Sequence, residues 1–254
     1  MADSLTEFTV SLAESAADLQ AAQALRYAVF VREMGADGAL VDHRQGLEKD
    51  HFDAFCEHMM IRESATGRVI GVYRLMRSDQ AEAAGRFYSE AEYDLSALTS
   101  SGRRLLELGR SCLHPDFRGG RALFHLWAGL NDYVSAHQIE VLFGVASFAG
   151  TDLEALAGPL SVLHRDYLAP EGLRCRSTRY QAMDLLPGDQ VDRKRAMIDC
   201  PALIKAYLRL GGKVGDGAYV DHDFNTTDVC MILDTEKMSE RQRRIYGARP
   251  AGKG

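Results

Sequence analysis

The sequence lacks the marks of several protein classes. Its five cysteines are odd in number, widely spaced and without a Cys-x-x-Cys pair, so we expect reduced thiols rather than a disulfide framework or a zinc site. No metal-ligand spacing such as His-Glu-x-x-His occurs, and we predict no metal. No apolar run approaches the roughly 18–20 residues of a membrane span, and the first residues carry no apolar signal segment. We therefore expect a cytoplasmic protein, with peripheral contact at the inner face of the membrane left open.

The charge balance excludes a broad basic surface. The 254 residues carry a net charge of −6 and a sequence pI near 5.8, so we expect no nucleic-acid partner. Arginines nevertheless gather in two stretches, although any one of them alone is better explained as a solvated side chain. They are Arg103, Arg104, Arg110, Arg118 and Arg121, followed by Arg174, Arg176 and Arg179. Such local patches on an acidic protein suit an anionic small molecule or an acidic partner.

Hydrophobic periodicity predicts an α/β chain. Ser15 suits the N-cap of a first helix that ends near Gly35. The long loop Gly35–Asp53 follows, and long loops in compact domains are often functional. The predicted strands are a short one at Phe8–Leu12, then Phe55–Glu63, Arg68–Arg77, Leu105–Leu113, Val141–Val145, Arg176–Leu185, Ala218–Val220 and Asp228–Leu233. Further helices are predicted after Gly120, over Asp152–Tyr167 and over Pro201–Leu210.

The segment Leu105–His137 carries the clearest chemical signal. A strand ends at a proline, a glycine-bearing turn follows, and a helix begins. The helix N-terminus presents unpaired N–H groups, the glycines let an anion approach the backbone, and two arginines add charge. We predict a phosphate site formed by Phe117, Arg118, Gly119, Gly120, Arg121 and Ala122. The alternative is a plain connection, because Gly-Gly turns before helices are common.

Charged residues also interrupt apolar segments. Glu107 and Arg110 stand three apart on a predicted strand, and such positions face opposite sides unless the strand bulges. Arg74 interrupts another apolar strand, and Asp50 and Asp53 punctuate the end of the long loop. Each taken alone reads as a structural ion pair, a surface residue or a loop cap. Together they supply cations for a carboxylate or phosphate and anions for an ammonium group.

These features resemble the GNAT acyltransferases, in which the turn between strand and helix cradles the pyrophosphate or phosphopantetheine of the acyl donor. Over roughly residues 19–150 the chain is also similar to acyl-homoserine-lactone synthases, which use acyl carrier protein as donor. The shared order is Arg26-Tyr-Ala-Val-Phe30, Asp50-His-Phe-Asp53, Arg74-Leu75 and Glu107-Leu-Gly-Arg110. The tryptophan that those synthases place after the first helix is missing, and Met34-Gly35 stands there.

A fuller resemblance, over almost the whole chain, is to the ornithine N-acyltransferases of bacterial ornithine-lipid synthesis. They share this motif order and add a C-terminal segment, which reads here as Cys200–Gly212 and Asp221–Asp228. The resemblance implies a GNAT-type mixed central sheet flanked by helices over residues 1–186. A C-terminal α+β extension, residues 187–254, is expected to pack on that core.

The resemblance also implies an activity: transfer of a long-chain 3-hydroxyacyl group from acyl carrier protein to the α-amine of ornithine, the first step of ornithine-lipid synthesis. No cofactor is expected to be bound permanently, because the donor carries 4'-phosphopantetheine. The early glycines of the turn favour that carrier-bound donor over coenzyme A.

The same activity gives each charged residue an expected role. Glu107 and Arg110 are the expected catalytic pair. Glu107 accepts the amine proton, and Arg110 either orients Glu107 or faces the donor. Arg26 and Arg74 are expected to bind the carboxylate of the acceptor. Asp50 and Asp53 are expected to bind the second ammonium group of the acceptor. Three alternatives remain open: a lactone-synthase-like enzyme, a coenzyme A-dependent acyltransferase on another small amine, and a non-catalytic module that binds acyl carrier protein.

Overall fold

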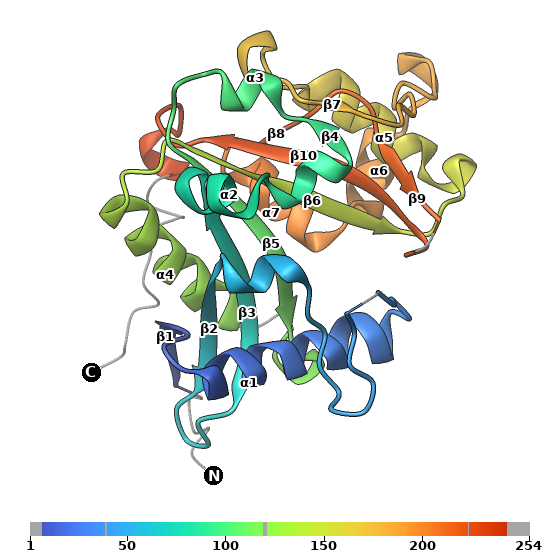
Figure 1. Cartoon of the computed structure of the whole chain (residues 1–254). Coiled ribbons are helices and arrows are strands. Elements are labelled where there is room, and N and C mark those ends of the chain that lie inside the picture. Colours follow the sequence, from blue (N-terminus) through green and yellow to red (C-terminus); the bar gives the residue numbers. More distant parts are fainter. Residues whose placement is uncertain (1–6, 39, 119–120, 223, 243–254) are drawn as a thin grey trace. The chain divides into compact units, whose positions relative to one another are not determined.

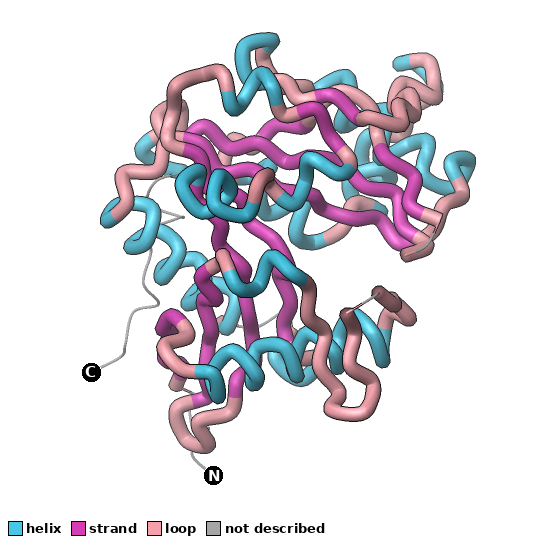
Figure 2. Tube along the Cα trace, in the orientation of Figure 1, coloured by secondary structure: helices cyan, strands magenta, loops and turns pink. Residues whose placement is uncertain are grey.

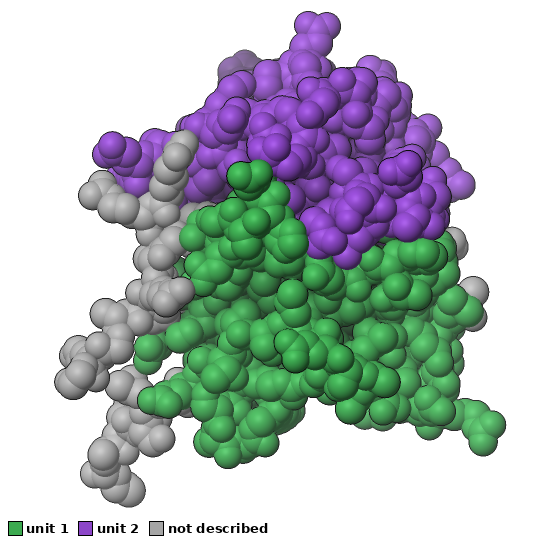
Figure 3. Space-filling view, turned by 60° about the vertical axis from the view of Figure 1, so that its left-hand side comes forward, with its two compact units in different colours: residues 1–76, 108–138, 244–254 green, residues 77–107, 139–243 purple. Residues whose placement is uncertain are grey.

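The computed structural model describes residues 7–38, 40–118, 121–222 and 224–242. These residues form two compact units, which Figure 3 shows in different colours. Unit 1 holds the described residues within Met1–Met76 and Leu108–Gln138, and unit 2 those within Arg77–Glu107 and Ile139–Arg243. The boundary expected between residues 186 and 187 lies inside unit 2, so the division into a core and an extension stays a prediction about the sequence.

Unit 1 is built on antiparallel strands with a helix on each face. Its strands are β1 (Phe8–Leu12), β2 (Glu57–Glu63), β3 (Val69–Arg77) and β5 (Leu105–Leu113), which begins in unit 2, and they lie in this order. Helix α1 (Ala16–Arg26) crosses one face (Figure 1), where Leu25 packs with Met60. Helix α4 (Ala122–Ala136) lies on the other face, and its Gly129 approaches Val10 closely. A Cβ on Gly129 would meet Val10 Cγ1 at 2.5 Å, so only glycine allows this packing.

Helix α1 begins as the sequence predicts and ends differently. Ser15 accepts a hydrogen bond from the Asp18 N–H, and the Asp18 carboxylate accepts one from the Ser15 N–H, which completes a capping box. After Arg26 the chain continues as a π-helix, Tyr27–Glu33. Such wide turns are rare and frequently lie at functional sites. Here the change of helix type falls directly after the first charged residue of the predicted site.

Unit 2 holds strands of a mixed sheet and a separate two-stranded sheet, with helices packed around them (Figure 2). Its strands and helices are β4 (Tyr93–Asp94), β6 (Val141–Ala149), β7 (Arg176–Ser177), β8 (Lys213–Val214), β9 (Tyr219–Asp221), β10 (Thr226–Asp234), α2 (Ser78–Ala84), α3 (Ser96–Thr99), α5 (Leu153–Tyr167), α6 (Arg193–Asp199) and α7 (Ala202–Arg209). The first three residues of β5 run parallel to β6, and β10 pairs antiparallel with all nine residues of β6. The GNAT-type mixed sheet flanked by helices is confirmed.

One predicted strand is wrong over most of its length. Of Arg176–Leu185, only Arg176–Ser177 forms a strand, β7, paired with β4. Burial does not alternate along it: Ser177 and Met183 are buried, but residues 178 to 180 are exposed in succession. The partner segments are also short, and Gln181 makes only an isolated bridge to Ala218. A local sequence pattern without a long neighbouring strand therefore does not give a ladder.

Candidate active site

Three arginines and three carboxylates meet in unit 1, and we call them the arginine–carboxylate cluster. Its members are Arg26, Glu48, Asp50, Asp53, Arg74 and Arg110. Arg26 donates to Glu48 at 2.5 Å and to Asp53 at 2.8 Å. Arg74 donates to both oxygens of Asp50, at 2.6 and 2.7 Å, and to Asp53 at 3.0 Å. Arg110 donates to Glu48 at 3.1 Å and to Asp50 at 3.0 Å. Each carboxylate thus joins two arginines, and the formal charges of the cluster cancel.

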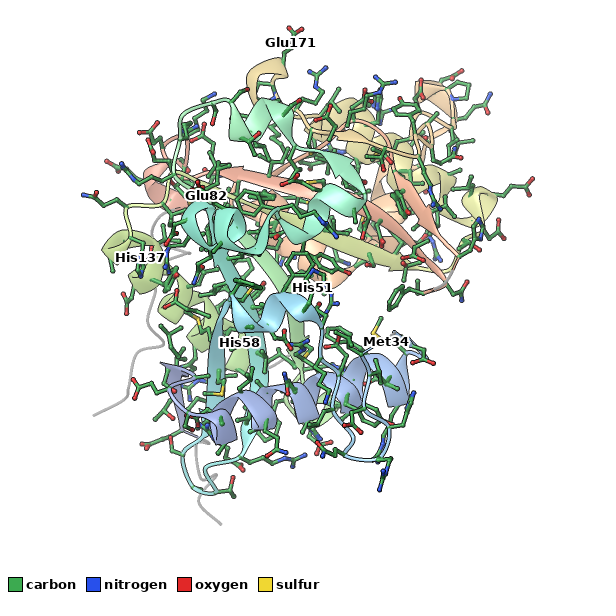
Figure 4. All side chains as sticks on the ribbon, viewed as in Figure 1. Met34, His51, His58, Glu82, His137 and Glu171 are labelled. Carbon is green, nitrogen blue, oxygen red and sulfur yellow. The ribbon has the colours of Figure 1, made fainter. Side chains whose placement is uncertain are left out.

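Local structure brings these side chains together. Arg26 ends α1, Arg74 lies on β3 and Arg110 on β5. The carboxylates come from the end of the long loop, where Asp50 caps the short 3-10 helix His51–Ala54 by accepting from the Phe52 N–H at 2.9 Å. His58 on β2 lies 3.2 Å from the Asp53 carbonyl oxygen and fixes the other end of that helix. Figure 4 labels His51 and His58, which mark this region.

The neighbouring arginines keep the two aspartates of the cluster ionised. Burial alone would raise the pKa of Asp53, but Arg26 and Arg74 lower it far below its usual range. Burial likewise opposes ionisation of Asp50, and Arg74 and Arg110 hold its pKa below the ordinary value. His58 behaves in the opposite way, because burial lowers its pKa and favours the neutral ring. The site therefore presents fixed charges and a neutral histidine at physiological pH.

Exposure divides the cluster into an interior and an edge. The side chain of Arg26 is fully buried, and those of Arg74 and Asp53 are 3% and 5% exposed. Asp50 and Arg110 retain 17% and 18% exposure. The structure brings together all four residues assigned to the acceptor, and the inner three, Arg26, Arg74 and Asp53, pair with one another and with Glu48 and Asp50. Asp50 and Arg110 are the members placed to meet a ligand.

The backbone at Arg110 is strained. Its φ of 51° lies in the left-handed region, which costs a non-glycine residue about 1–3 kcal/mol. This kink interrupts the regular alternation of β5, as the sequence requires if Glu107 and Arg110 are to serve one site. Arg110 belongs to unit 1 and Glu107 to unit 2, so their joint action stays a prediction.

Glu107 is a firmly held carboxylate of unit 2. It is buried, and its two oxygens accept hydrogen bonds from the Ser89 and Tyr88 N–H groups at 2.7 and 2.8 Å. On the same sheet it stands beside Phe143 of β6, which packs edge-on against Phe87. The backbone therefore fixes the position of this carboxylate, as a proton acceptor in catalysis requires.

The predicted phosphate turn is described except for Gly119 and Gly120, which lie outside the described residues. Phe117 packs edge-on against Phe8. Arg118 donates to both oxygens of Glu33, at 2.5 and 2.7 Å, and to the Leu113 carbonyl at 3.0 Å. Arg121 is exposed at the start of α4, and Ala122 is buried as the first helical residue. Arg118 is thus engaged by the protein, whereas Arg121 faces solvent.

Comparison with known proteins decides the family. Residues 25–128 match the model of an acetyltransferase (GNAT) domain. The chain is 54% identical to an L-ornithine N(alpha)-acyltransferase of Rhodobacter capsulatus over 100% of both chains. It is 44% identical to an enzyme of the same name from Brucella abortus, over 94% of this chain and 88% of the relative. The chain belongs to the L-ornithine N(alpha)-acyltransferase family.

Members of this family are N-acyltransferases, so the predicted enzyme class is confirmed. Solved structures agree on the fold. A CoA-dependent acyl-homoserine lactone synthase aligns with a TM-score of 0.54 and 12% identity, over 94% of this chain and 88% of that chain.

Sequence reasoning missed two residues that bind to members of the arginine–carboxylate cluster. Glu48 bridges Arg26 and Arg110, and Gln23 donates to Asp53 at 2.9 Å. The sequence gives no signal for Glu48, because a charge count requires knowing which arginines fold together. Gln23 gives no signal either, since a glutamine on a helix is usually exposed.

Proposed function

We propose that the chain transfers a long-chain 3-hydroxyacyl group from acyl carrier protein to the α-amine of ornithine, the first step of ornithine-lipid synthesis. The observation that carries the acceptor is the 54% identity, over full length, to a relative named for ornithine. The acyl donor rests on the resemblance of the motif order to carrier-dependent synthases and on the chemistry of the turn before α4.

The edge of the arginine–carboxylate cluster suits this acceptor. Ornithine carries one carboxylate and two ammonium groups. Arg110 offers guanidinium N–H donors for a carboxylate, and Asp50 offers an acceptor for an ammonium. In this proposal Arg26, Arg74 and Asp53 do not touch ornithine, and they hold the two edge residues in place instead. Of the four residues that the sequence assigns to the acceptor, this proposal keeps Asp50 in contact with ornithine and adds Arg110, which the sequence assigns to the catalytic pair.

The reaction needs a positioned amine rather than an enzyme nucleophile. The amine nitrogen attacks the thioester carbonyl carbon, the C–N bond forms, and the C–S bond breaks. The sulfur leaves as a thiolate and takes up the proton that the amine loses. Glu107 is the proposed carrier of that proton, directly or through water. The motif order assigns it this role, and the two backbone N–H groups fix where its carboxylate lies.

The donor phosphate is assigned to the first turn of α4. The 15-residue helix presents unpaired N–H groups and the positive end of its dipole there. Arg121 adds an exposed cation, while the Arg118 charge is balanced by Glu33. No cofactor need stay bound, because the phosphopantetheine arrives and leaves with its carrier.

Cytoplasmic location and peripheral membrane contact are further parts of the proposal. In the described portion of the chain, no helix combines the length and the apolar character needed to cross a bilayer. The acylated product carries a long apolar chain, and each buried CH₂ contributes about 0.8 kcal/mol to membrane partitioning. Contact at the inner face of the membrane would let this product leave the enzyme directly into lipid.

Mass spectrometry of the products tests the proposal. The purified chain is incubated with 3-hydroxyacyl carrier protein and a pool of amino acids. Acyl-ornithine as the main product supports it. A different acylated amine would overturn the acceptor, and acetyl-ornithine formed from acetyl coenzyme A would overturn the donor. Positional fragmentation then separates the α-amide from the δ-amide, and only the α-amide agrees with the proposal.

A further inference from the structure

We propose that Phe124, an exposed phenylalanine on the first turn of α4, is the apolar contact that docks the carrier protein. The inference rests on the proposed carrier-bound donor, and it names the surface by which that donor is recognised. The partner is an acidic carrier protein whose phosphopantetheine phosphate reaches the turn before α4. A membrane surface is the competing occupant and is an outcome of the test.

Phe124 departs from the burial pattern of its helix. Other large apolar residues of α4 face the core, with Leu126 and Leu130 almost fully buried. Phe124 is 56% exposed on the outer side. A single exposed apolar residue is ordinary on a protein surface. Its position gives it significance, because it lies on the helix turn to which the donor phosphate is assigned, close to a cation.

That cation is Arg121. It precedes Phe124 by three residues, so the two side chains share one side of the helix turn. Among the described residues Arg121 has no hydrogen-bond or ion-pair partner, whereas Arg118 is neutralised by Glu33. The chain carries a net charge of −6 and repels an acidic partner in general. Arg121 and Phe124 therefore give an acidic carrier protein a local site that combines an attractive charge with an apolar contact.

The chemistry of the donor places the carrier at this point. In a phosphopantetheine arm the phosphate is esterified directly to a serine of the carrier, so the carrier surface lies next to the phosphate. Phe124 is three residues from Arg121, which corresponds to roughly 4.5 Å along the helix axis. A phosphate at the first turn of α4 thus brings the carrier over Phe124. Coenzyme A or free pantetheine brings no protein surface there.

Comparison of two donors isolates the docking contact. The same 3-hydroxyacyl group is offered on the carrier protein and on pantetheine alone. For Phe124→Ala we expect about a tenfold higher KM for the carrier-bound donor, with kcat little changed and both constants for acyl-pantetheine unchanged. Phe124→Leu should have a smaller effect. The matched control is Ile198→Ala, which removes another exposed apolar side chain, on α6 of unit 2.

Direct binding separates this inference from the proposed function. Fluorescence anisotropy of labelled carrier protein should show weaker binding to Phe124→Ala, even if the wild-type chain fails to acylate ornithine. Equal loss with both donors, or unchanged kinetics and binding, would overturn the docking contact. Sedimentation with vesicles of phosphatidylglycerol and phosphatidylcholine provides the third arm. If Phe124→Ala loses vesicle binding and keeps its carrier KM, the surface belongs to the membrane and the inference is wrong.

Discussion

Arg26→Met tests whether the arginine–carboxylate cluster is an interior structure rather than a substrate site. Arg26 is fully buried and is the partner of both Glu48 and Asp53. Its loss would leave these buried carboxylates each with one arginine instead of two. Removing one partner of a buried ion pair costs about 3–5 kcal/mol. In a chain of this size each kcal/mol of lost stability lowers Tm by about 2–4 °C. We therefore expect Tm to fall by roughly 6–20 °C, measured by circular dichroism at pH 7.

Two variants make this measurement decisive. Arg62→Met removes a guanidinium from the partly exposed pair with Asp18, and such pairs contribute only about 0–1 kcal/mol. The double variant Arg26→Met/Asp53→Asn removes one charge of each sign, and it should regain part of the lost Tm. The reasoning is refuted if Arg26→Met and Arg62→Met melt at the same temperature.

Other perturbations separate the remaining roles. Glu107→Gln should lower kcat about 10²–10⁴-fold in steady-state assays, and wild-type turnover would remove Glu107 from proton transfer. Asp50→Asn should raise the KM for ornithine about tenfold with a smaller change in kcat, and an unchanged KM would contradict the edge assignment. The lowered pKa of Asp53 contributes stability above the unfolded pKa near 4, and this is lost as pH falls below it. Asp53→Asn should therefore flatten the Tm profile at acidic pH, and a profile as steep as wild type would count against the assignment. Burial raises the pKa of Asp228 to about 6, so its ionisation costs stability as pH rises from about 4 to 6. Asp228→Asn should raise Tm at pH 7, and a lower Tm would show that ionised Asp228 does not destabilise the fold.

Most of the fold follows from sequence periodicity because the elements bury one face each. The predicted strand Leu105–Leu113 matches β5 residue for residue, and Ser15 caps α1 as expected. The π-helix after Arg26 has no such signal, since its residues also suit an α-helix. Arg176–Leu185 shows the limit of alternation, because pairing depends on a partner segment that the local pattern does not contain.

The motif order identified most of the charged residues of the cluster, but it could not show which of them are buried and which are exposed. A buried arginine and an exposed arginine look alike in a sequence, and only the loop Gly35–Asp53 folding over α1 and β3 decides which is which. Glu48 shows this most clearly, because it stands between Leu47 and Lys49 as an ordinary loop residue and becomes a bridge only after folding. Burial of charge is a tertiary property, which is why the sequence neither reveals Glu48 nor separates the buried Arg26 from the residues at the edge of the cluster.

The members of the cluster differ in exposure, so their variants should fall into two groups that different measurements detect. With the buried Glu48 counted, the charges of the interior members Arg26, Arg74 and Asp53 cancel, so replacing Arg26 or Asp53 should appear first in Tm. Edge members keep part of their surface open, so replacing Asp50 or Arg110 should appear first in the KM for the acceptor. If all four variants changed KM equally and left Tm untouched, the cluster would open fully to bind ornithine, and the division into interior and edge would be wrong. A split between the two readouts would instead show that a neutral, preformed interior holds two charges in place for the acceptor.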